Sequence, residues 1–279
     1  MRELAGTVAV VTGAASGIGR CLALRLARER CALALADVDA SGLDETAAKV
    51  RPSGMRVSTH RVDVSSRAAM EAFRDAVVKE HGHVNLLINN AGVALMGNVA
   101  DLTLEEIEWL IGINFWGVVH GVKLFLPLLQ QQHQAHIVNV SSIFGMIAPP
   151  GNAPYCASKF AVRGFTEALR HECETAGGRI KVSTVHPGGI RTAIARHARA
   201  AASVSNAERS AALTRFDQLA RTSPEDAAER IVQGILRDEE RILIGGDARF
   251  LDRLHRLFPV RYWPILLRLG VFRRASKAP

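Results

Sequence analysis

Cysteine is scarce in this 279-residue chain, which has only four: Cys21, Cys31, Cys156 and Cys173. Their spacing matches no pattern of metal ligands, and Cys21 and Cys31 fall in a predicted helix and in the strand that follows it. Cys156 has no evident histidine or aspartate partner, so we expect a packing residue rather than a nucleophile. The sequence therefore favours reduced thiols in the cytoplasm and predicts neither disulfides nor a metal site.

Long apolar runs are also missing from the sequence. The opening residues, MRELAGTVAVVTG, contain neither the apolar core nor the cleavage site of a secretory signal, and no run of ~18 apolar residues follows. Neither a repeat nor a low-complexity linker divides the chain, and its 48% hydrophobic content suffices for a sizeable core. We expect one soluble, intracellular domain.

Acidic residues are almost absent from the C-terminal end, where Asp252 is the only one after residue 248. Residues 249–279 therefore carry +7 of the formal charge of +8, and the first 248 residues carry about +1. The basic residues of this end are Arg249, Arg253, Arg256, Arg261, Arg268, Arg273, Arg274 and Lys277. A nearly neutral body with a basic end argues against a nucleic-acid-binding domain.

Short apolar segments alternate with segments of helical periodicity along residues 1–246. The predicted strands are VAVVTG, ALALAD, RVSTHRVD, VNLLINNAG, HIVNVSS, IKVSTVHPGG and RILIGG. The predicted helices cover residues 18–30, 41–50, 68–81, a long segment ending near 132, 155–175 and 224–236. Alternating strands and helices form right-handed βαβ units, which produce a parallel sheet covered on both faces. The expected fold class is α/β, with a doubly wound parallel sheet in a single domain.

The segment 192–222 lacks strand signals and separates the end of one predicted strand from the last predicted helix. In open α/β sheets, ligands bind outside the carboxyl ends of the strands, where this segment would emerge. We expect it to act as a lid. The alternative is an exposed helical insertion without a role.

A glycine-rich segment, TGAASGIG (Thr12 to Gly19), follows the first predicted strand and opens the first helix. Glycines at such a turn let the backbone approach a ligand, and the free N–H groups of the helix N-terminus attract a pyrophosphate. The spacing G-x-x-x-G-x-G differs from the usual G-x-G-x-x-G, so the motif is informative mainly through its place between a strand and a helix. It predicts a nucleotide-binding loop.

Asp37 closes the second predicted strand, 18 residues after Gly19. An acid at this place hydrogen-bonds a ribose 2′-hydroxyl and would repel a 2′-phosphate. Neither neighbour, Ala36 or Val38, is basic. The sequence therefore predicts NAD in preference to NADP.

Tyr155 and Lys159, in the segment YCASK, stand four residues apart, which places them on one face of a helix. A nearby ammonium group favours the phenolate and lowers the pKa of a tyrosine, which is ordinarily near ~10. The pair can form a general base, although the same spacing is common in ordinary helices.

Motifs in order along residues 1–246 resemble those of the short-chain dehydrogenase/reductase family. They are TGAASGIG, DVS from Asp63, NNAG from Asn89, GINFWG with Asn114, NVSS with Ser142, the YCASK segment and HPGGIRT from His186. The resemblance implies a Rossmann fold and an enzyme that transfers a hydride between NAD(P) and a substrate. Chemistry of this kind needs no metal.

The resemblance implies a catalytic tetrad of Asn114, Ser142, Tyr155 and Lys159. Tyr155 would exchange a proton with the substrate oxygen, while Lys159 would lower the tyrosine pKa and hold the nicotinamide ribose. Ser142 would donate a hydrogen bond to the developing alkoxide or carbonyl oxygen, whereas Ser141 would face the opposite side of its strand. Asn114 would sit at a helix distortion and hold a water that relays protons.

The resemblance also implies the residues that hold the cofactor. The glycine-rich loop would contact the pyrophosphate, Asp63 and Val64 would border the adenine, and the turn after His186 would seat the nicotinamide carboxamide. The expected set is Gly13, Ser16, Gly17, Ile18, Gly19, Asp37, Asp63, Val64, Asn90, Ala91, Gly92, Tyr155, Lys159, Pro187, Gly188, Ile190 and Thr192. His186 departs from the small or polar residue expected at its position, and we expect it to be structural.

The residues that would border the substrate are mostly apolar: Val93, Ala94, Leu95, Met96, Ile143, Phe144, Met146, Ala193 and Ile194. Such a lining favours a hydrophobic secondary alcohol or ketone, such as a sterol, a retinoid or a lipid-derived carbonyl. One alternative is an NADPH-dependent 3-ketoacyl reductase for acyl-carrier substrates, which would normally have a basic residue in place of Asp37. The other is a non-catalytic nucleotide-binding protein, which the complete tetrad argues against.

Residues 247–279 lie beyond the resemblance and form a basic, amphipathic extension. Its apolar residues recur at helical spacing (Phe250, Leu251, Leu254, Leu257 and Phe258), with arginines on another face. Basic residues beside aromatic and aliphatic ones are typical of a helix in the membrane interface. The alternative is packing over the substrate cleft or a neighbouring subunit.

The resemblance also implies a homotetramer or homodimer, formed through the long helices that contain Asn114 and Tyr155.

Overall fold

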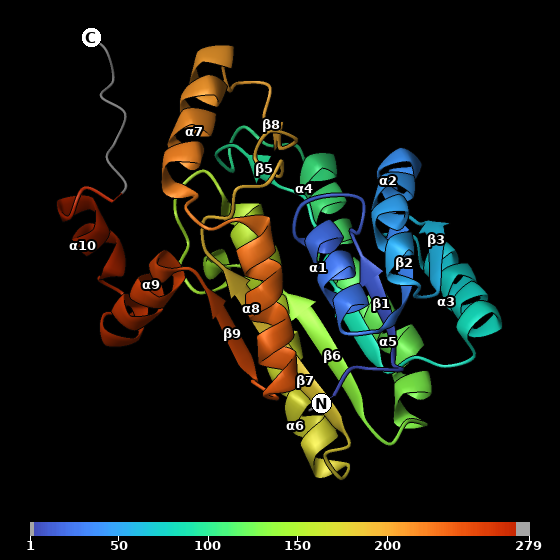
Figure 1. Ribbon diagram of the computed structural model, residues 1–279. Coiled ribbons are helices and arrows are strands. Elements are labelled where there is room, and N and C mark those ends of the chain that lie inside the picture. The colour runs from blue at the N-terminus through green and yellow to red at the C-terminus, as the bar shows by residue number, and fades with distance from the viewer. Residues whose placement is uncertain (1–2, 272–279) are drawn as a thin grey trace.

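The computed structural model describes residues 3–271, and its centre is a sheet of seven parallel strands (Figure 1). The strands are β1 (Val8–Thr12), β2 (Ala32–Asp37), β3 (Val57–Arg61), β4 (Leu86–Asn89), β6 (Ala135–Val140), β7 (Ile180–Pro187) and β9 (Arg241–Ile244). Their order is β3-β2-β1-β4-β6-β7-β9, so the direction of winding reverses between β1 and β4. Ligands of doubly wound sheets bind at such a reversal. The predicted fold class is confirmed.

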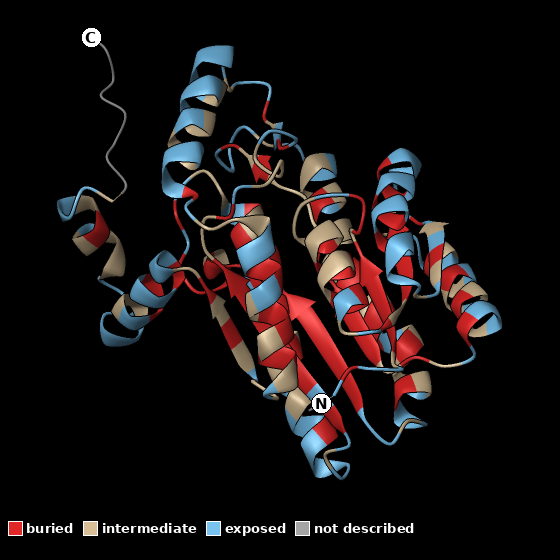
Figure 2. Ribbon diagram, viewed as in Figure 1, coloured by how far each residue is buried: buried red, intermediate tan, exposed pale blue. Residues whose placement is uncertain are grey.

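Helices cover both faces of the sheet (Figure 1). One face carries α1 (Gly17–Arg28), α2 (Ala40–Val50) and α8 (Pro224–Leu236), and the other carries α3 (Arg67–His81), α5 (Gly117–Gln130) and α6 (Ala153–Thr175). Because its strands are buried on both sides, the sheet lies at the centre of the core, and the outer faces of the helices are exposed (Figure 2).

The longest apolar helix is Leu104–Gln130, which joins α4 (Leu104–Ile111), a π-helical turn (η2, Gly112–Trp116) and α5. By length and by a mean hydropathy of 1.4 it could cross a membrane, although polar residues such as Asn114, His120 and Lys123 interrupt its apolar sequence. In the structure its inner face packs on the sheet through residues such as Val118, Val122 and Phe125. A core helix passes the same test, so the hydropathy is weak evidence for a membrane span.

The segment 192–222 leaves and rejoins the body at one point. Ile190 forms a parallel bridge with Thr222, and the N–H of Thr222 donates to the carbonyl of Gly189 at 3.3 Å. Its helix α7 (Asn206–Leu219) has no buried residue, as the pale colour in Figure 2 shows. The segment is therefore a loop closed at its base.

A small second sheet ties this segment to the body. Its strand β8 (Arg199–Ala200) pairs with β5 (Leu95–Met96), which lies in the loop after β4. The guanidinium of Arg199 also stacks on the ring of Trp109 in α4, 3.7 Å from the ring centroid. The start of the segment is thus held by backbone pairing and by a cation–π contact.

The C-terminal extension forms two helices, α9 (Gly246–Leu257) and α10 (Tyr262–Arg268). Their inner faces pack on the loop that follows Ser142, which contains the 3₁₀ turn η3 (Ile143–Gly145). Elsewhere in the fold, a second 3₁₀ turn, η1 (Arg51–Ser53), follows α2. The hydroxyl of Tyr262 accepts a hydrogen bond from the N–H of Ala148 at 3.0 Å. The extension therefore packs against the loop that follows Ser142. The predicted basic residues Arg273, Arg274 and Lys277 lie outside the described residues.

Candidate active site

The glycine-rich loop joins β1 to α1 beside the reversal of strand order. Gly13 and Gly17 have left-handed backbone angles, with φ of 66° and 52°. A Cβ on Gly13 would lie 2.8 Å from the Cα of Ala91, and one on Gly19 would lie 1.9 Å from the carbonyl oxygen of Gly13. Thr192 lies near the Cβ position of Gly17, at 3.3 Å. The fold therefore brings three predicted cofactor segments together.

Asn90 and Ala91 are held against this loop by hydrogen bonds to Thr12. The side-chain amide of Asn90 donates to the carbonyls of Thr12 and Gly13, at 2.9 and 3.1 Å. The hydroxyl of Thr12 accepts from the backbone N–H groups of Asn90 and Ala91, at 3.0 and 3.1 Å. Thr12 was not in the predicted site, although it is the first residue of the quoted motif.

Asp37 lies at the carboxyl end of β2, and its carboxylate braces the glycine-rich loop. One oxygen accepts from the N–H of Ala15 at 3.0 Å and the other from the N–H of Asp39 at 3.1 Å. At the end of β3, the carboxylate of Asp63 accepts from the N–H of Ser65 at 2.9 Å, and Val64 is buried. The predicted adenine-side residues therefore line one edge of the sheet.

Tyr155 and Lys159 lie one turn apart on α6, as predicted, next to Ser142 at the end of β6. The side chain of Ser142 acts to lower the pKa of Tyr155, and the tyrosine ring packs edge-on against Phe144, with 6.2 Å between centroids. The Nζ atom of Lys159 lies 5.7 Å from the centroid of the tyrosine ring and donates to the carbonyl of Val140 at 3.1 Å. A phenol, a hydroxyl and an ammonium group thus meet at one point.

Burial dominates the titration of this pair. Withdrawal from water raises the pKa of Tyr155 to about 12, although the hydrogen bond with Ser142 acts in the opposite direction. That Lys159 lowers the tyrosine pKa stays a prediction, because burial sets the net direction of the shift in the protein alone. Burial also lowers the pKa of Lys159, to about 8. At neutral pH the tyrosine carries its proton and can donate it to a substrate oxygen.

Asn114 lies in the π-helical turn, so the helix distortion expected there is present. Its side chain accepts from the N–H of Val93 at 2.8 Å and donates to the carbonyl of the same residue at 3.0 Å. It also donates to the hydroxyl of Ser158 at 3.2 Å. A Cβ on Gly92 would lie 3.3 Å from the Oδ1 of Asn114 and 3.4 Å from the Nζ of Lys159. The four residues of the predicted tetrad therefore gather around one space.

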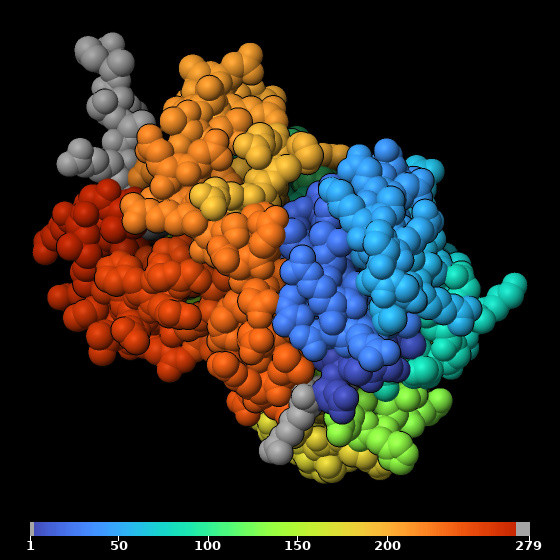
Figure 3. Space-filling model, in the orientation of Figure 1, coloured from blue at the N-terminus to red at the C-terminus, as the bar shows by residue number. Residues whose placement is uncertain are grey.

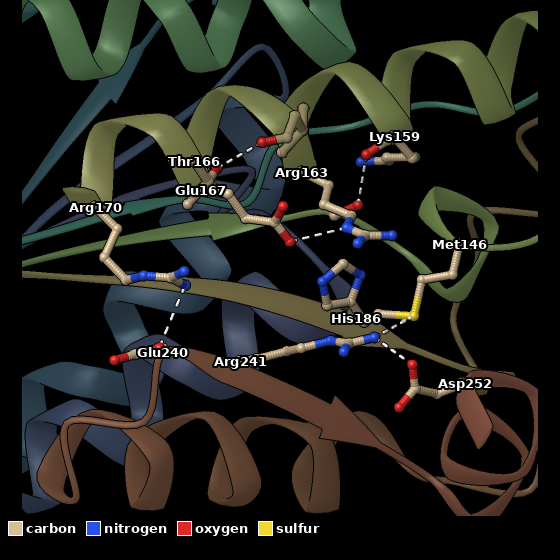
Figure 4. A network of polar contacts seen from close by, with 12 residues as sticks. Met146, Lys159, Arg163, Thr166, Glu167, Arg170, His186, Glu240, Arg241 and Asp252 are labelled. Carbon is tan, nitrogen blue, oxygen red and sulfur yellow. Dashed lines mark hydrogen bonds and ion pairs between the residues drawn. The ribbon is translucent and has the colours of Figure 1, made fainter. Parts of the chain in front are cut away.

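His186 is fully buried behind Ser142, between Arg163 and Arg241 (Figure 4). Its Nδ1 lies 3.0 Å from the carbonyl oxygen of Ser142. Burial lowers the pKa of His186 to about 4, so the ring is neutral at pH 7 and its Nδ1–H donates to that carbonyl. A structural imidazole was predicted here, and this contact shows that the ring holds the backbone at Ser142.

Three of the residues predicted to border the substrate face the interior. Leu95, Ile143 and Met146 are buried, the last two against the C-terminal extension. The others are partly exposed: Val93, Ala94, Met96, Phe144, Ala193 and Ile194.

Burial raises the pKa of Cys156 to about 12, so this thiol does not supply a thiolate at neutral pH. In residues 3–271, no three His, Cys, Asp or Glu side chains group as metal ligands.

Replacing Lys159 by Met is expected to stabilise the protein at pH 7. Between pH 8 and 10.5 the unfolded chain binds a proton at Lys159 that the native protein does not, so wild-type stability rises with pH across this window. Below pH 8, burial of the charged lysine lowers the free energy of unfolding of the wild type by at most about 3 kcal/mol. Methionine removes this cost but also loses the hydrogen bond to Val140, which is worth about 1 kcal/mol. We expect a Tm a few degrees higher, measured by thermal unfolding.

The gain in Tm should shrink as the pH rises from 8 to 10, because the wild-type lysine is then neutral in the native state. Lys79→Met provides the matched control, since Lys79 is an exposed lysine on α3. It should change Tm little at either pH. A lower Tm for Lys159→Met at pH 7 would contradict the assigned cost of burial.

Comparison with known proteins gives a consistent class. The family model for short chain dehydrogenases matches residues 7–203. The oxidoreductase SadH of Mycobacterium tuberculosis is 47% identical over 264 residues, 94% of each chain. Human estradiol 17-beta-dehydrogenase 11 is 31% identical over 270 residues, which cover 96% of this chain and 84% of the human protein.

Among solved structures, a short chain dehydrogenase/reductase from Burkholderia phymatum in complex with NAD superposes with a TM-score of 0.85. It is 33% identical, and the match covers 100% of this chain and 99% of that one. The chain therefore belongs to the short-chain dehydrogenase/reductase family of oxidoreductases.

Proposed function

We propose that the protein is an NAD-dependent dehydrogenase that interconverts a hydrophobic secondary alcohol and its ketone. The observation that carries the proposal is the placement of Tyr155 and Lys159 one turn apart on α6, with Nζ 5.7 Å from the tyrosine ring, beside Ser142 and with Asn114 across Gly92. This is an acid/base group, an oxyanion donor and a cation around one space.

The residues present fit a dinucleotide. Glycine at positions 13, 17 and 19 keeps the strand-to-helix turn open, and the N-terminus of α1 faces it, where a pyrophosphate would lie. Asp37 would hold the adenine-side ribose, and Pro187 to Thr192 the nicotinamide end. The NAD in the Burkholderia relative supports this cofactor, and the carboxylate of Asp37 favours NAD over NADP.

Bound NAD would supply the acceptor for the hydride that leaves the substrate carbon. In the oxidative direction, the phenolate of Tyr155 takes the proton of the alcohol, and Ser142 donates a hydrogen bond to the substrate oxygen. In the reductive direction, the protonated phenol returns the proton. Lys159 carries the positive charge that stabilises the phenolate of Tyr155. Beside these residues, the side chain of Asn114 accepts a hydrogen bond from the N–H of Val93.

The substrate class follows from the partly exposed apolar side chains around Tyr155, Phe144 first among them. The human relative is named for estradiol, a hydrophobic steroid with a secondary hydroxyl, which supports the same class. Segment 192–222, closed at its base beside Gly189, would cover such a substrate as a lid.

Incubation with NAD and a panel of hydrophobic secondary alcohols tests the proposal, with reduced nicotinamide followed by absorbance. We expect turnover of at least one sterol, retinoid or lipid-derived alcohol, and weaker activity with sugars and hydroxy acids. Failure of the protein to bind NAD or NADP would refute the enzymatic assignment. Selective reduction of 3-ketoacyl substrates with NADPH would favour the alternative reductase.

The π-helical turn η2 and helix α6 support a homodimer or homotetramer. They carry a group of aromatic side chains, in which the half-buried Phe115 lies 6.0 Å from Trp116 and 6.2 Å from Phe165 between ring centroids. Trp116 and Phe160 are exposed large hydrophobic residues. A second copy of the chain would cover them across a two-fold axis. A monomer by light scattering at micromolar concentration would contradict this proposal.

The outer surface of the C-terminal extension supports peripheral contact of this cytoplasmic protein with a membrane. Leu257 is 73% exposed, Val260 86% and Leu269 60%, with Phe250 and Phe258 beside them. In Figure 3, α9 and α10 form one continuous surface beside α8. Arginines flank these apolar residues, as in helices that lie in the interface of anionic bilayers.

The wild-type protein is expected to co-sediment with anionic liposomes at low salt and to be released as salt rises. Leu257→Glu combined with Val260→Glu should abolish sedimentation, because it places two acids on the apolar surface. Val99→Glu is the matched control, since it changes an exposed valine elsewhere. Equal sedimentation of both variants, or none by the wild type, would remove the membrane proposal.

A further inference from the structure

The turn after β7 is held from the C-terminal extension by one carboxylate. Asp247, in the first turn of α9, accepts a hydrogen bond from the N–H of Gly189 at 2.6 Å. The preceding N–H, of Gly188, donates to the carbonyl of Ile244 in β9 at 3.0 Å. The N–H groups of Gly188 and Gly189 are thus both bound by the segment that joins β9 to α9. The hydrogen bond to the carboxylate of Asp247 is charge-assisted, so it is stronger than the hydrogen bond to the carbonyl of Ile244.

Packing around the carboxylate agrees with this contact. A Cβ on Gly188 would lie 2.3 Å from both oxygens of Asp247, and one on Gly245 would lie 2.3 Å from Oδ1. On the other side of the turn, a Cβ on Gly189 would lie 2.9 Å from the Cα of Ala220, at the end of the lid segment. The turn is therefore enclosed between the extension and the base of segment 192–222.

We propose that Asp247 is a positioning residue that fixes the Pro187–Gly189 turn, and through it the binding site for the nicotinamide end of the cofactor. This inference rests on the proposed NAD-binding function. The turn leads directly into Ile190 and Thr192, and the side chain of Thr192 already lies against the glycine-rich loop at Gly17. A shift of the turn would move these residues while leaving the adenine side, at Asp37, in place.

Calorimetry with two ligands separates the two ends of the site. NAD contains the nicotinamide, whereas ADP-ribose lacks only that base. Asp247→Ala is expected to weaken NAD binding at least about tenfold, the lower end of the worth of a hydrogen bond to a charged group, and to leave ADP-ribose binding unchanged. Asp247→Asn, which keeps an oxygen acceptor, should restore most of the NAD affinity.

A double-mutant cycle tests the contact between Asp247 and the turn. Gly188→Ala adds a methyl group at the carboxylate, so it should weaken NAD binding in the wild-type background. It should cost much less in the Asp247→Ala background, where the methyl group has room.

The outcomes are distinct. Unchanged NAD affinity in Asp247→Ala, equal weakening of NAD and ADP-ribose, or an additive cycle would each overturn the positioning role. Wild-type protein that binds neither ligand would instead refute the proposed function. Unfolding curves of the unliganded variants accompany the titrations, and equal Tm values show that a loss of affinity is local to the turn.

Discussion

Tyr155→Phe is expected to lower kcat by at least about 10²-fold, the usual contribution of general acid/base catalysis. The variant keeps the ring that packs edge-on against Phe144 and loses only the hydroxyl that would exchange the proton. The affinity for NAD should therefore change little. Steady-state kinetics with the alcohol selected from the panel, together with calorimetry for NAD, measure the two effects separately.

Tyr262→Phe is the matched control, because Tyr155 and Tyr262 are the two tyrosines of the chain. Tyr262 accepts a hydrogen bond from the N–H of Ala148, which is not a residue of the predicted tetrad. Its loss should leave kcat within a few-fold of wild type. If Tyr155→Phe retained more than about a tenth of wild-type kcat, its role as the proton-transfer group would be wrong.

Asp37→Ala combined with Val38→Arg is expected to reverse the cofactor preference from NAD to NADP. The double variant removes the carboxylate at the end of β2 and places a guanidinium at a position that is 58% exposed. Removing like-charge repulsion and adding a charge-assisted partner for the 2′-phosphate should shift the ratio of kcat/KM values by about 10²-fold or more. Kinetics with both cofactors measure this ratio.

Val38→Arg alone separates the two contributions. It supplies the guanidinium but keeps the carboxylate, and it should improve NADP use only slightly. The single variant Asp37→Ala also removes the brace on the N–H of Ala15, so it should weaken both cofactors as well as changing their ratio. A wild-type preference for NADP would contradict the role assigned to Asp37.

The strands and helices were predictable because each carries its own local pattern. The predicted helix 224–236 coincides with α8, and Asp37 ends β2 as its apolar run indicated. The distortion at Asn114 followed from the family resemblance rather than from periodicity. Two-residue strands such as β5 and β8 have no such pattern, because their pairing depends on segments about 100 residues apart.

The site was less predictable where it depends on burial and on distant contacts. The sequence placed Lys159 beside Tyr155 correctly, but it could not show that withdrawal from water raises the pKa of the tyrosine. The amphipathic pattern of α9 predicted a helix without showing which loop it covers. The contact of Asp247 with Gly189 joins residues 58 positions apart, so no local pattern could reveal it.

The stacking of Arg199 on Trp109 offers a way to follow this contact through the intrinsic fluorescence of the tryptophan. The chain has three tryptophans, and each marks a different surface: Trp109 the start of segment 192–222, Trp116 the outer face of the long helix, and Trp263 the C-terminal extension. We expect the emission of the Trp109 indole to change when the guanidinium, now 3.7 Å from the ring centroid, moves away. Single-tryptophan versions of the enzyme would therefore test the proposed lid movement, subunit association and bilayer contact as three separate optical signals.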